Sequence, residues 1–149
     1  MGARTTPSPR SNAASVSFHA VSEPFPPVTV TAGRGRFRLH GVACRAGTDL
    51  SVVVTAGDRP HIGCVVVAHP HPATDDRRRI SVTSSVLATP PHREEALARP
   101  LAESLARKLG GTVVVVAGVH TDRLTRRGIL TYLKLAEELG EKLLQRLES

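Results

Sequence analysis

Three short polar stretches interrupt a chain whose middle and end are otherwise rich in valine, leucine and alanine. Each stretch lies at the end of a predicted strand or in the loop beside one, where a rigid scaffold presents binding groups. The side chains that they offer are His61, Ser84, Ser85, His92, Arg93, His120 and Asp122. If the strand ends converge in the folded chain, imidazoles, a carboxylate and a guanidinium meet in one pocket.

Two kinds of binding site could use this set of side chains. His61, His120 and Asp122 are candidate ligands for a divalent metal, although no H-x-x-x-H or C-x-x-C spacing fixes the geometry. Helix N-termini after Pro91 and Thr121, together with nearby cationic side chains, would instead attract an anionic phosphate. The sequence therefore indicates a ligand site and leaves both chemistries open.

A serine nucleophile is a weaker interpretation of the same residues. Ser84 or Ser85 with His120 could form a hydrolase pair, but the two serines lie in a predicted strand and no G-x-S-x-G elbow is present. Ser84 could equally be a hydrogen-bonded core hydroxyl, and Asp122 could cap the last helix instead of binding a ligand. These structural alternatives stay open at the level of sequence.

Five strands and two helices must position these residues. Phe37, Leu39 and Gly41 alternate with polar neighbours, which is typical of a strand with one wet face. Leucines at helical spacing precede the helix stop Gly110-Gly111. The predicted strands are 36–43, 50–55, 61–68, 80–88 and 112–119. The order is ββββαβα, an α+β fold in which a mostly antiparallel sheet carries two packed helices.

Two details of the helices are specific enough to test. Pro100 would cost about 3 kcal/mol inside a helix, so we expect the first helix to begin only a few residues earlier, with Pro100 in its first turn. The residues expected to line the buried face of the terminal helix are Ile129, Leu133, Ala136, Leu143 and Leu147.

The chain is expected to form one domain preceded by an arm. Residues 1–33 contain five of the eleven prolines, so they are predicted to be disordered or weakly ordered, although Val28 and Val30 could add a short edge strand. Residues 34–149 form the single predicted α+β domain. Its central strands are apolar on both faces, so helices on one face would leave the other uncovered. A second copy of the chain is expected to cover it, giving a homodimer.

The charge of the chain places limits on its partners. The formal charge of +7 comes from 20 Lys and Arg against 13 Asp and Glu, with arginines clustered at 34, 36 and 38 and again at 77–79. These clusters are short, and Phe and Tyr together number only four, without Trp, so nucleic-acid binding is disfavoured. The same clusters could steer a phosphorylated small ligand or an acidic protein partner.

A cytoplasmic location without membrane contact is expected. No apolar run approaches the roughly 20 residues that cross a bilayer. Pro7 and Pro9 stand where a secretory peptide would need its apolar segment.

The cysteines and the other histidines are expected to have structural or surface roles. Cys44 and Cys64 lie inside strand-like segments without a C-x-x-C pair, so we predict two small buried residues and no zinc site. His19, His69 and His71 are expected at the surface.

Three segments, taken in order, resemble a known family. They are GDRPHIGCVVVAHP, SVTSSVLATPPHREEALARPLAESLARKLGG and VVVVAGVHTDRLTRRGI. Together they resemble the prenylated-flavin chaperone family of the LpdD type, named for its association with gallate decarboxylase. The resemblance covers residues 36–147. It rests on P-H-I-G, on a serine-rich strand before H-[RK]-[ED], and on A-G-[IV]-H-x-D.

The resemblance implies a function as well as a fold. It implies a non-catalytic chaperone that binds reduced prenylated FMN and helps to supply it to a UbiD-type decarboxylase, with a UbiX-type flavin prenyltransferase as the source. The implied fold is similar to that of proteasome-assembly chaperones, which dimerise. The implied cofactor-binding residues are His61, Ile62, Gly63, Ser84, Ser85, His92, Arg93, Gly118, His120 and Asp122. Pro91 departs from the glycine expected before His92 in the family.

Two other functions are compatible with the same residues. One is a metal-dependent enzyme that acts on a small oxygenated substrate. The other is a dimeric assembly chaperone without a ligand, in which the histidines only pack.

Overall fold

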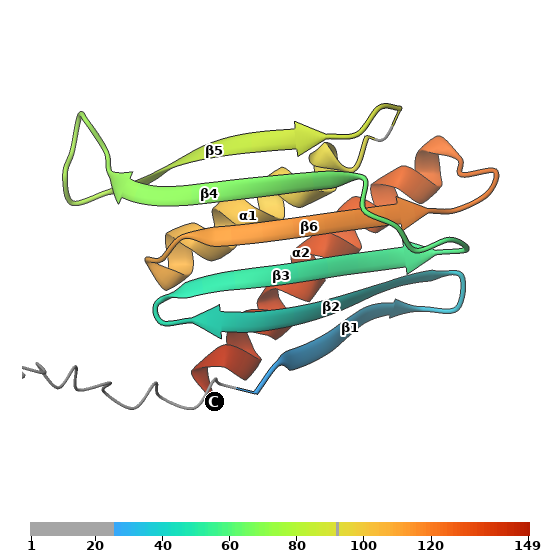
Figure 1. Ribbon diagram of the computed structural model, residues 1–149, viewed down its shortest axis with the longest axis horizontal. Helices are drawn as coiled ribbons and strands as arrows, with labels where there is room; N and C mark the ends of the chain where they lie inside the picture. Colours follow the sequence, from blue (N-terminus) through green and yellow to red (C-terminus); the bar gives the residue numbers. More distant parts are fainter. Residues whose placement is uncertain (1–25, 92) are drawn as a thin grey trace, which may run out of the picture.

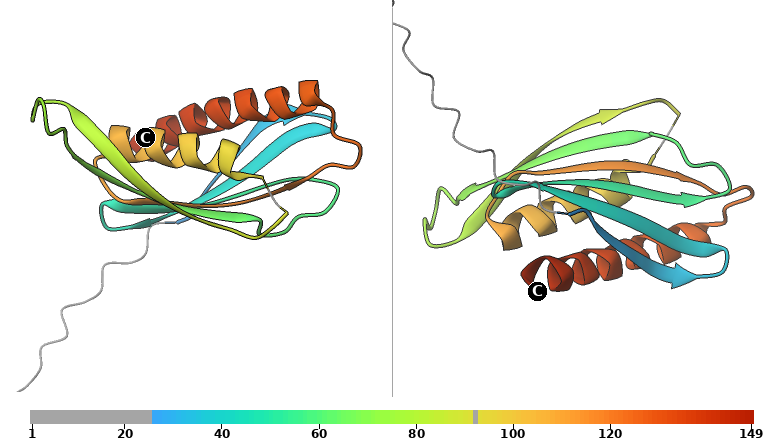
Figure 2. Two further views of the ribbon diagram at one scale, coloured as in Figure 1. Left: turned by 90° about the horizontal axis from the view of Figure 1, so that it is seen from above. Right: turned by 60° about the horizontal axis from the view of Figure 1, so that its bottom comes forward.

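A six-stranded sheet with two helices on one of its faces makes up the fold, shown in Figure 1 as a computed structural model. The structure describes residues 26–91 and 93–149. The strands are β1 (Val28–Arg34), β2 (Phe37–Ala46), β3 (Asp49–Gly57), β4 (Cys64–Pro72), β5 (Ile80–Ala88) and β6 (Val113–His120). The helices are α1 (Glu95–Leu109) and α2 (Arg126–Glu148), and both lie on the same side of the sheet (Figure 2). The predicted α+β class is confirmed.

The connectivity brings distant segments together at one end of the sheet. The strand order is β1-β2-β3-β6-β4-β5. All neighbours are antiparallel except β3 and β6, which run parallel from the Leu50–Val113 pair to the Gly57–His120 pair. Because β6 is inserted between β3 and β4, the ends of β3 and β6 lie beside the start of β4.

β1 is a strand that the predicted order lacks. It pairs antiparallel with β2 at the sheet edge, and its own residues Val30 and Ala32 are buried. The arm expected over residues 1–33 is therefore shorter than predicted, since residues 28–33 belong to β1. Residues 1–25, which include His19, lie outside the described residues.

β4 starts and ends later than predicted. Residues 58–62 form a loop, and the N–H of Gly63 then donates to the carbonyl of Ala117 at 2.9 Å as the chain joins the sheet. β6 pairs with β4 only as far as Ala68. Pro70 and Pro72 consequently lie where β4 has a neighbour on one side alone, so their missing N–H groups cost no ladder bond to β6.

The core lies between the helices and the sheet. Its largest fully buried side chains include Leu39, Leu105, Leu139 and Leu143. Glycine allows close approach of the layers: a Cβ added to Gly41 would lie 3.0 Å from the Leu139 side chain. The alternation of buried and exposed residues along β2 and β3 follows from this one-sided core.

Pro100 lies in the second turn of α1 and not in the first, because the helix begins at Glu95. The bond that Pro100 cannot donate would have gone to the carbonyl of Ala96. Both residues are exposed, so water can satisfy that carbonyl. The prediction was wrong by about one turn, because it applied the full cost of an interior proline to a position where water can compensate.

The buried face of α2 also differs in part from the prediction. Tyr132, Ala136, Leu139 and Leu143 are buried, whereas Ile129 is 47% exposed. Gly128, the residue before Ile129, is buried beside the Phe37 ring of β2, so the face that α2 turns to the sheet is rotated from the predicted one. Neither helix of the described residues combines the length and apolar character that a membrane-spanning helix requires.

The sheet face opposite the helices, called here the open face, carries no other element of the described chain (Figure 2). Val42 is 38% exposed on this face and Val53 is 42% exposed. Cys44 lies on the open face and is exposed, so the prediction of two buried cysteines is correct only for Cys64. The open face is therefore an uncovered surface with apolar side chains at its centre.

Candidate functional site

The first and third polar stretches meet at one end of the sheet. His61 lies in the β3–β4 loop and His120 is the last residue of β6, and their ring centroids are 6.2 Å apart with an interplanar angle of 73°. Strand order explains this proximity, because β6 is inserted next to both β3 and β4. We call His61, His120, Arg59, Glu94 and Asp122 the strand-end cluster.

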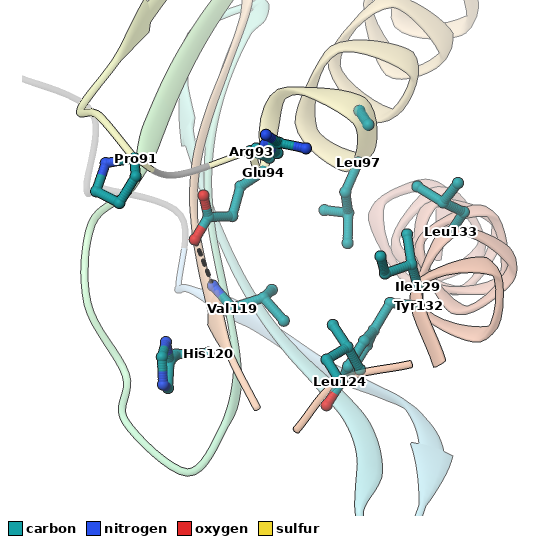
Figure 3. Close-up of a pocket in the computed structure, with 11 residues that line it drawn as sticks. Pro91, Arg93, Glu94, Leu97, Val119, His120, Leu124, Ile129, Tyr132 and Leu133 are labelled. Atoms are coloured by element: carbon teal, nitrogen blue, oxygen red, sulfur yellow. Dashed lines mark hydrogen bonds between the residues drawn. The ribbon is translucent and has the colours of Figure 1, made fainter. Parts of the chain in front are cut away.

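Both ring nitrogens of His61 contact protein atoms. Nδ1 lies 3.0 Å from the carbonyl oxygen of Arg59, and Nε2 lies 2.9 Å from Oε1 of Glu94. The Glu94 side chain is only 6% exposed, and its Oε1 also accepts the backbone N–H of Val119 at 3.3 Å (Figure 3). Glu94 therefore ties the β3–β4 loop and β6 to the N-terminus of α1.

Hydrogen-bond chemistry fixes one proton of this pair. A carbonyl oxygen can only accept, so Nδ1 of His61 must carry a proton. The bond between Nε2 and Glu94 then requires a second proton, held by the imidazole or by the carboxyl group. With both nitrogens engaged in this way, His61 is suited to positioning the loop.

Glycines make this close arrangement possible. A Cβ on Gly118 would lie 1.6 Å from the carbonyl oxygen of His61, and a Cβ on Gly63 would lie 2.6 Å from Oε1 of Glu94. Real Cβ atoms do not approach so closely. The glycines of P-H-I-G and A-G-V-H therefore have a physical reason: they let the loop lie directly on β6 and let the carboxylate enter beneath it.

His120 belongs to an exposed group of charged side chains. Its Nε2 lies 2.9 Å from the Arg59 guanidinium and 3.1 Å from Oδ1 of Asp122, and Arg59 also contacts that oxygen at 3.1 Å. The hydrogen bond from His120, followed by that from Arg59, lowers the pKa of Asp122 below its ordinary value. Asp122 therefore stays ionised and keeps His120 and Arg59 together.

Asp122 is not the N-cap of α2, which excludes one of the two roles, helix capping and ligand binding, that the sequence left open for it. Thr125 is the N-cap, and its hydroxyl accepts the N–H of Gly128 at 3.1 Å. The carboxylate of Asp122 faces the strand-end cluster, and its own N–H donates to Asp58 at 2.9 Å.

An apolar pocket of about 400 Å³ opens beside the cluster, between the sheet end and the N-termini of both helices (Figure 3). Its apolar walls are Leu97, Val119, Leu124, Ile129, Tyr132 and Leu133. Pro91, Arg93, Glu94 and His120 also line it. The pocket therefore combines a hydrocarbon surface with a guanidinium and a carboxylate, which suits an amphiphilic ligand. The His120 ring itself lies on the other side of β6 from the apolar walls (Figure 3).

The second polar stretch is divided by the fold. Arg93 reaches the pocket, but the hydroxyl of Ser84 donates to Glu103 at 2.6 Å and accepts from Arg99 at 2.7 Å on the flank of α1. Ser85 follows it in β5, is exposed and faces the open side. The serines therefore do not join His61 and His120.

The remaining expected site residues have different surroundings. Ile62 is 64% exposed in the β3–β4 loop, and Gly63 and Gly118 are buried next to the cluster. His92 lies outside the described residues. Among residues 26–91 and 93–149, no three His, Cys, Asp or Glu side chains are placed to hold a metal ion. The expectation of a divalent metal at His61, His120 and Asp122 is therefore not supported.

Two members of the cluster were missed as site residues from sequence. Glu94 stands in the HREE run and Arg59 precedes the P-H-I-G motif, but a charged residue beside a motif normally indicates only solvent exposure. Arg59 stands between Gly57 and His61 in the sequence, but Glu94 has no glycine nearby, so only its place directly after His92 and Arg93 could have pointed to it. No pattern in the sequence marks the apolar wall residues of the pocket as part of a binding site.

Comparison with solved structures defines the class of fold. The chain is similar to a chain of a chaperone complex for yeast 20S proteasome assembly, with a TM-score of 0.55 and 15% identity. The match covers 83% of this chain and 94% of that one. The fold is therefore of the proteasome-assembly-chaperone type, as the sequence analysis expected.

Sequence comparison identifies the family. Residues 33–148 match the family described as prenylated flavin chaperone LpdD-like domain, and the chain belongs to this family. It is also 22% identical over 121 residues to Protein LpdD of Lactiplantibacillus plantarum, covering 81% of this chain and 85% of that protein. The family resemblance drawn from the three motifs is confirmed.

Proposed function

We propose that this protein is a non-catalytic carrier that binds reduced prenylated FMN at the pocket beside the strand-end cluster. The observation that supports this most directly is an apolar cavity of about 400 Å³ with Arg93 and His120 among its lining residues. A flavin ring system needs apolar walls, and its phosphate needs cationic or N–H donors. The residues present fit both requirements. Arg93 and the N-terminus of α1 would serve the anionic end.

The proposal treats the cofactor as cargo. Prenylated FMN would exert its chemistry in the UbiD-type decarboxylase that receives it, after a UbiX-type prenyltransferase has made it. A non-catalytic role agrees with the engaged nitrogens of His61 and with the absence of serine or cysteine among the described residues that line the pocket. Shielding of the bound ring by the pocket walls would protect a reduced flavin during transfer.

Anaerobic co-purification tests this function. When the chain is co-expressed with a flavin prenyltransferase, prenylated flavin is expected to elute with it. His120→Ala should weaken retention by about tenfold, because it removes the imidazole that contacts Arg59 and Asp122 in the strand-end cluster beside the pocket. His71→Ala is the matched control, since His71 lies at the far end of β4 and bonds Thr83 at 2.9 Å. Elution of the wild-type chain without any flavin would contradict the proposal.

We further propose that two copies pack through their open faces. One row of apolar side chains crosses five adjacent strands at a common register, because Val42 pairs with Val53, Val53 and Val65 both pair with Val116, and Val65 pairs with Leu87. Leu87 is 77% exposed in the single chain. A continuous apolar row is typical of a surface that another protein layer covers.

A charge in the middle of this row is expected to separate the copies. Val53→Lys should weaken dimerisation by about a hundredfold, because each copy would bury a lysine at the interface. Val53 is 42% exposed in the single chain, so the variant should still fold. Gln145→Lys adds the same charge on an exposed position of α2 and should leave the dimer intact. Sedimentation velocity gives the answer: equal masses for both variants would contradict the open-face dimer.

A further inference from the structure

A second cavity, of about 360 Å³, lies between the β1–β2 turn and the β3–β4 loop. We call it the arginine groove. Its polar lining comes from Arg36, Arg38, His40, Thr55 and Asp58. Arg38 and His40 alternate along β2 with the buried Leu39, which places them on the open face. The arginine groove and the apolar pocket therefore share no lining residue.

The two guanidinium groups of the arginine groove keep their charge. Arg36 donates to the backbone carbonyl of Asp122, a neutral acceptor that holds the side chain without compensating it. Within the described parts of the chain, no carboxylate lies within ion-pairing distance of Arg36 or Arg38. Arg36 is therefore held in place by its hydrogen bond, whereas the Arg38 side chain beside it is available to bind a ligand.

The other polar groups add donors to the arginine groove. Nδ1 of His40 lies 3.2 Å from the hydroxyl of Thr31, so its Nε2 is left for another partner. His40 and Thr55 are direct neighbours across β2 and β3. Asp58 is the acidic lining residue, and one of its oxygens already accepts the N–H of Asp122 at 2.9 Å. Two guanidinium groups against one engaged carboxylate give the groove a net positive charge.

We infer that the arginine groove binds a phosphate monoester, with Arg38 as its principal ligand. Planar guanidinium groups bind phosphate oxygens through paired N–H donors, and this geometry favours phosphate over a simple halide. The volume falls within the range of small-molecule sites, so it accommodates an organic group beyond the phosphate. The ester is either the ribityl phosphate of the cofactor, bound here instead of at Arg93 and the N-terminus of α1 and resting on the proposed function, or an independent small phosphate ester.

Phosphate titration of the flavin-free chain tests the arginine groove. Inorganic phosphate at low ionic strength is expected to give a saturable shift of the His40 imidazole resonances in NMR spectra. Arg38→Gln should weaken this binding by about tenfold or more, since it removes a charge-assisted contact. Arg38→Lys should recover part of it. Arg34→Gln is the matched control: Arg34 is exposed near the same turn, does not line the groove, and its loss should leave binding unchanged.

Three outcomes would overturn the inference, and two separate its sources. Absence of saturable binding, or equal weakening by Arg38→Gln and Arg34→Gln, excludes the site. Competition by FMN but not by riboflavin assigns the groove to the cofactor phosphate, whereas competition by glycerol phosphate but not by FMN assigns it to an independent ester. Phosphate binding that neither ester displaces overturns the monoester assignment. Since no prenylated flavin is used, failure here leaves the co-purification test unaffected.

Discussion

Glu94→Ala is expected to lower the free energy of unfolding by about 3–5 kcal/mol, as breaking a buried pair on one side does. The carboxylate is 6% exposed, and its Oε1 contacts His61 Nε2 at 2.9 Å and Val119 N–H at 3.3 Å. Alanine would remove both of these hydrogen bonds. Urea denaturation followed by circular dichroism measures the change. The variant should also lose prenylated flavin, because the β3–β4 loop would no longer be tied to α1.

Glu95→Ala is the matched control for this change. Glu95 follows Glu94 in the chain, but its ion pair with Arg99 at 2.7 Å is about half exposed, with side-chain exposures of 46% and 38%. Exposed pairs contribute about 0–1 kcal/mol, so this variant should remain close to wild type. Equal losses for Glu94→Ala and Glu95→Ala would contradict the role given to the buried carboxylate.

A double variant tests the same contact in a different way. A methyl group on Gly63 would lie 2.6 Å from Oε1 of Glu94, so Gly63→Ala alone should displace the carboxylate. Once Glu94→Ala has removed that carboxylate, the added methyl group no longer clashes with it. The combined loss should therefore be smaller than the sum of the single losses. Strict additivity would mean that the two groups do not meet.

The elements that build a one-sided core were predictable because burial leaves a period in the sequence. Leu97, Leu101 and Leu105 repeat at helical spacing and are all buried in α1. Phe37 and Leu39 alternate with arginines, and β2 shows the same alternation of buried and exposed residues. The edge strand β1 was foreseen only as a possible short strand at Val28 and Val30, because Pro26 and Pro27 stand directly before it. Its partner β2 supplies order that local composition cannot reveal.

The site was predictable only in part, because its geometry depends on strand order. His61 and His120 were expected to converge, and the insertion of β6 beside β4 brings them within 6.2 Å. Periodicity cannot show which partner a side chain of β5 meets, and Ser84 bonds Arg99 and Glu103 on α1 and does not reach the pocket. The internal partner of His61 depends on the approach of α1, which places Glu94 beneath the loop. Such contacts between segments about 30 residues apart leave no local pattern.

Gly118→Ala is expected to destabilise the chain by about 1–3 kcal/mol or more and to abolish retention of prenylated flavin. A Cβ at this position would lie 1.6 Å from the carbonyl oxygen and 2.4 Å from the carbonyl carbon of His61. Both are backbone atoms, so relief requires the whole β3–β4 loop to lift from β6. That movement would separate His61 from Glu94 and open the strand-end cluster. Thermal unfolding and anaerobic co-purification measure the two effects.

Gly41→Ala separates the effect of a displaced backbone from that of a filled gap. It makes the same substitution in a strand of the same sheet, but the nearest atom to the new Cβ is a Leu139 methyl at 3.0 Å. A side-chain methyl can shift by a few tenths of an ångström through rotation, whereas a carbonyl fixed in a loop cannot. Gly41→Ala should therefore cost less and leave flavin retention intact, because Leu139 lies in the core away from the pocket lining. If both variants kept the cofactor equally well, the close packing of the His61 loop on β6 would not be what holds the site together.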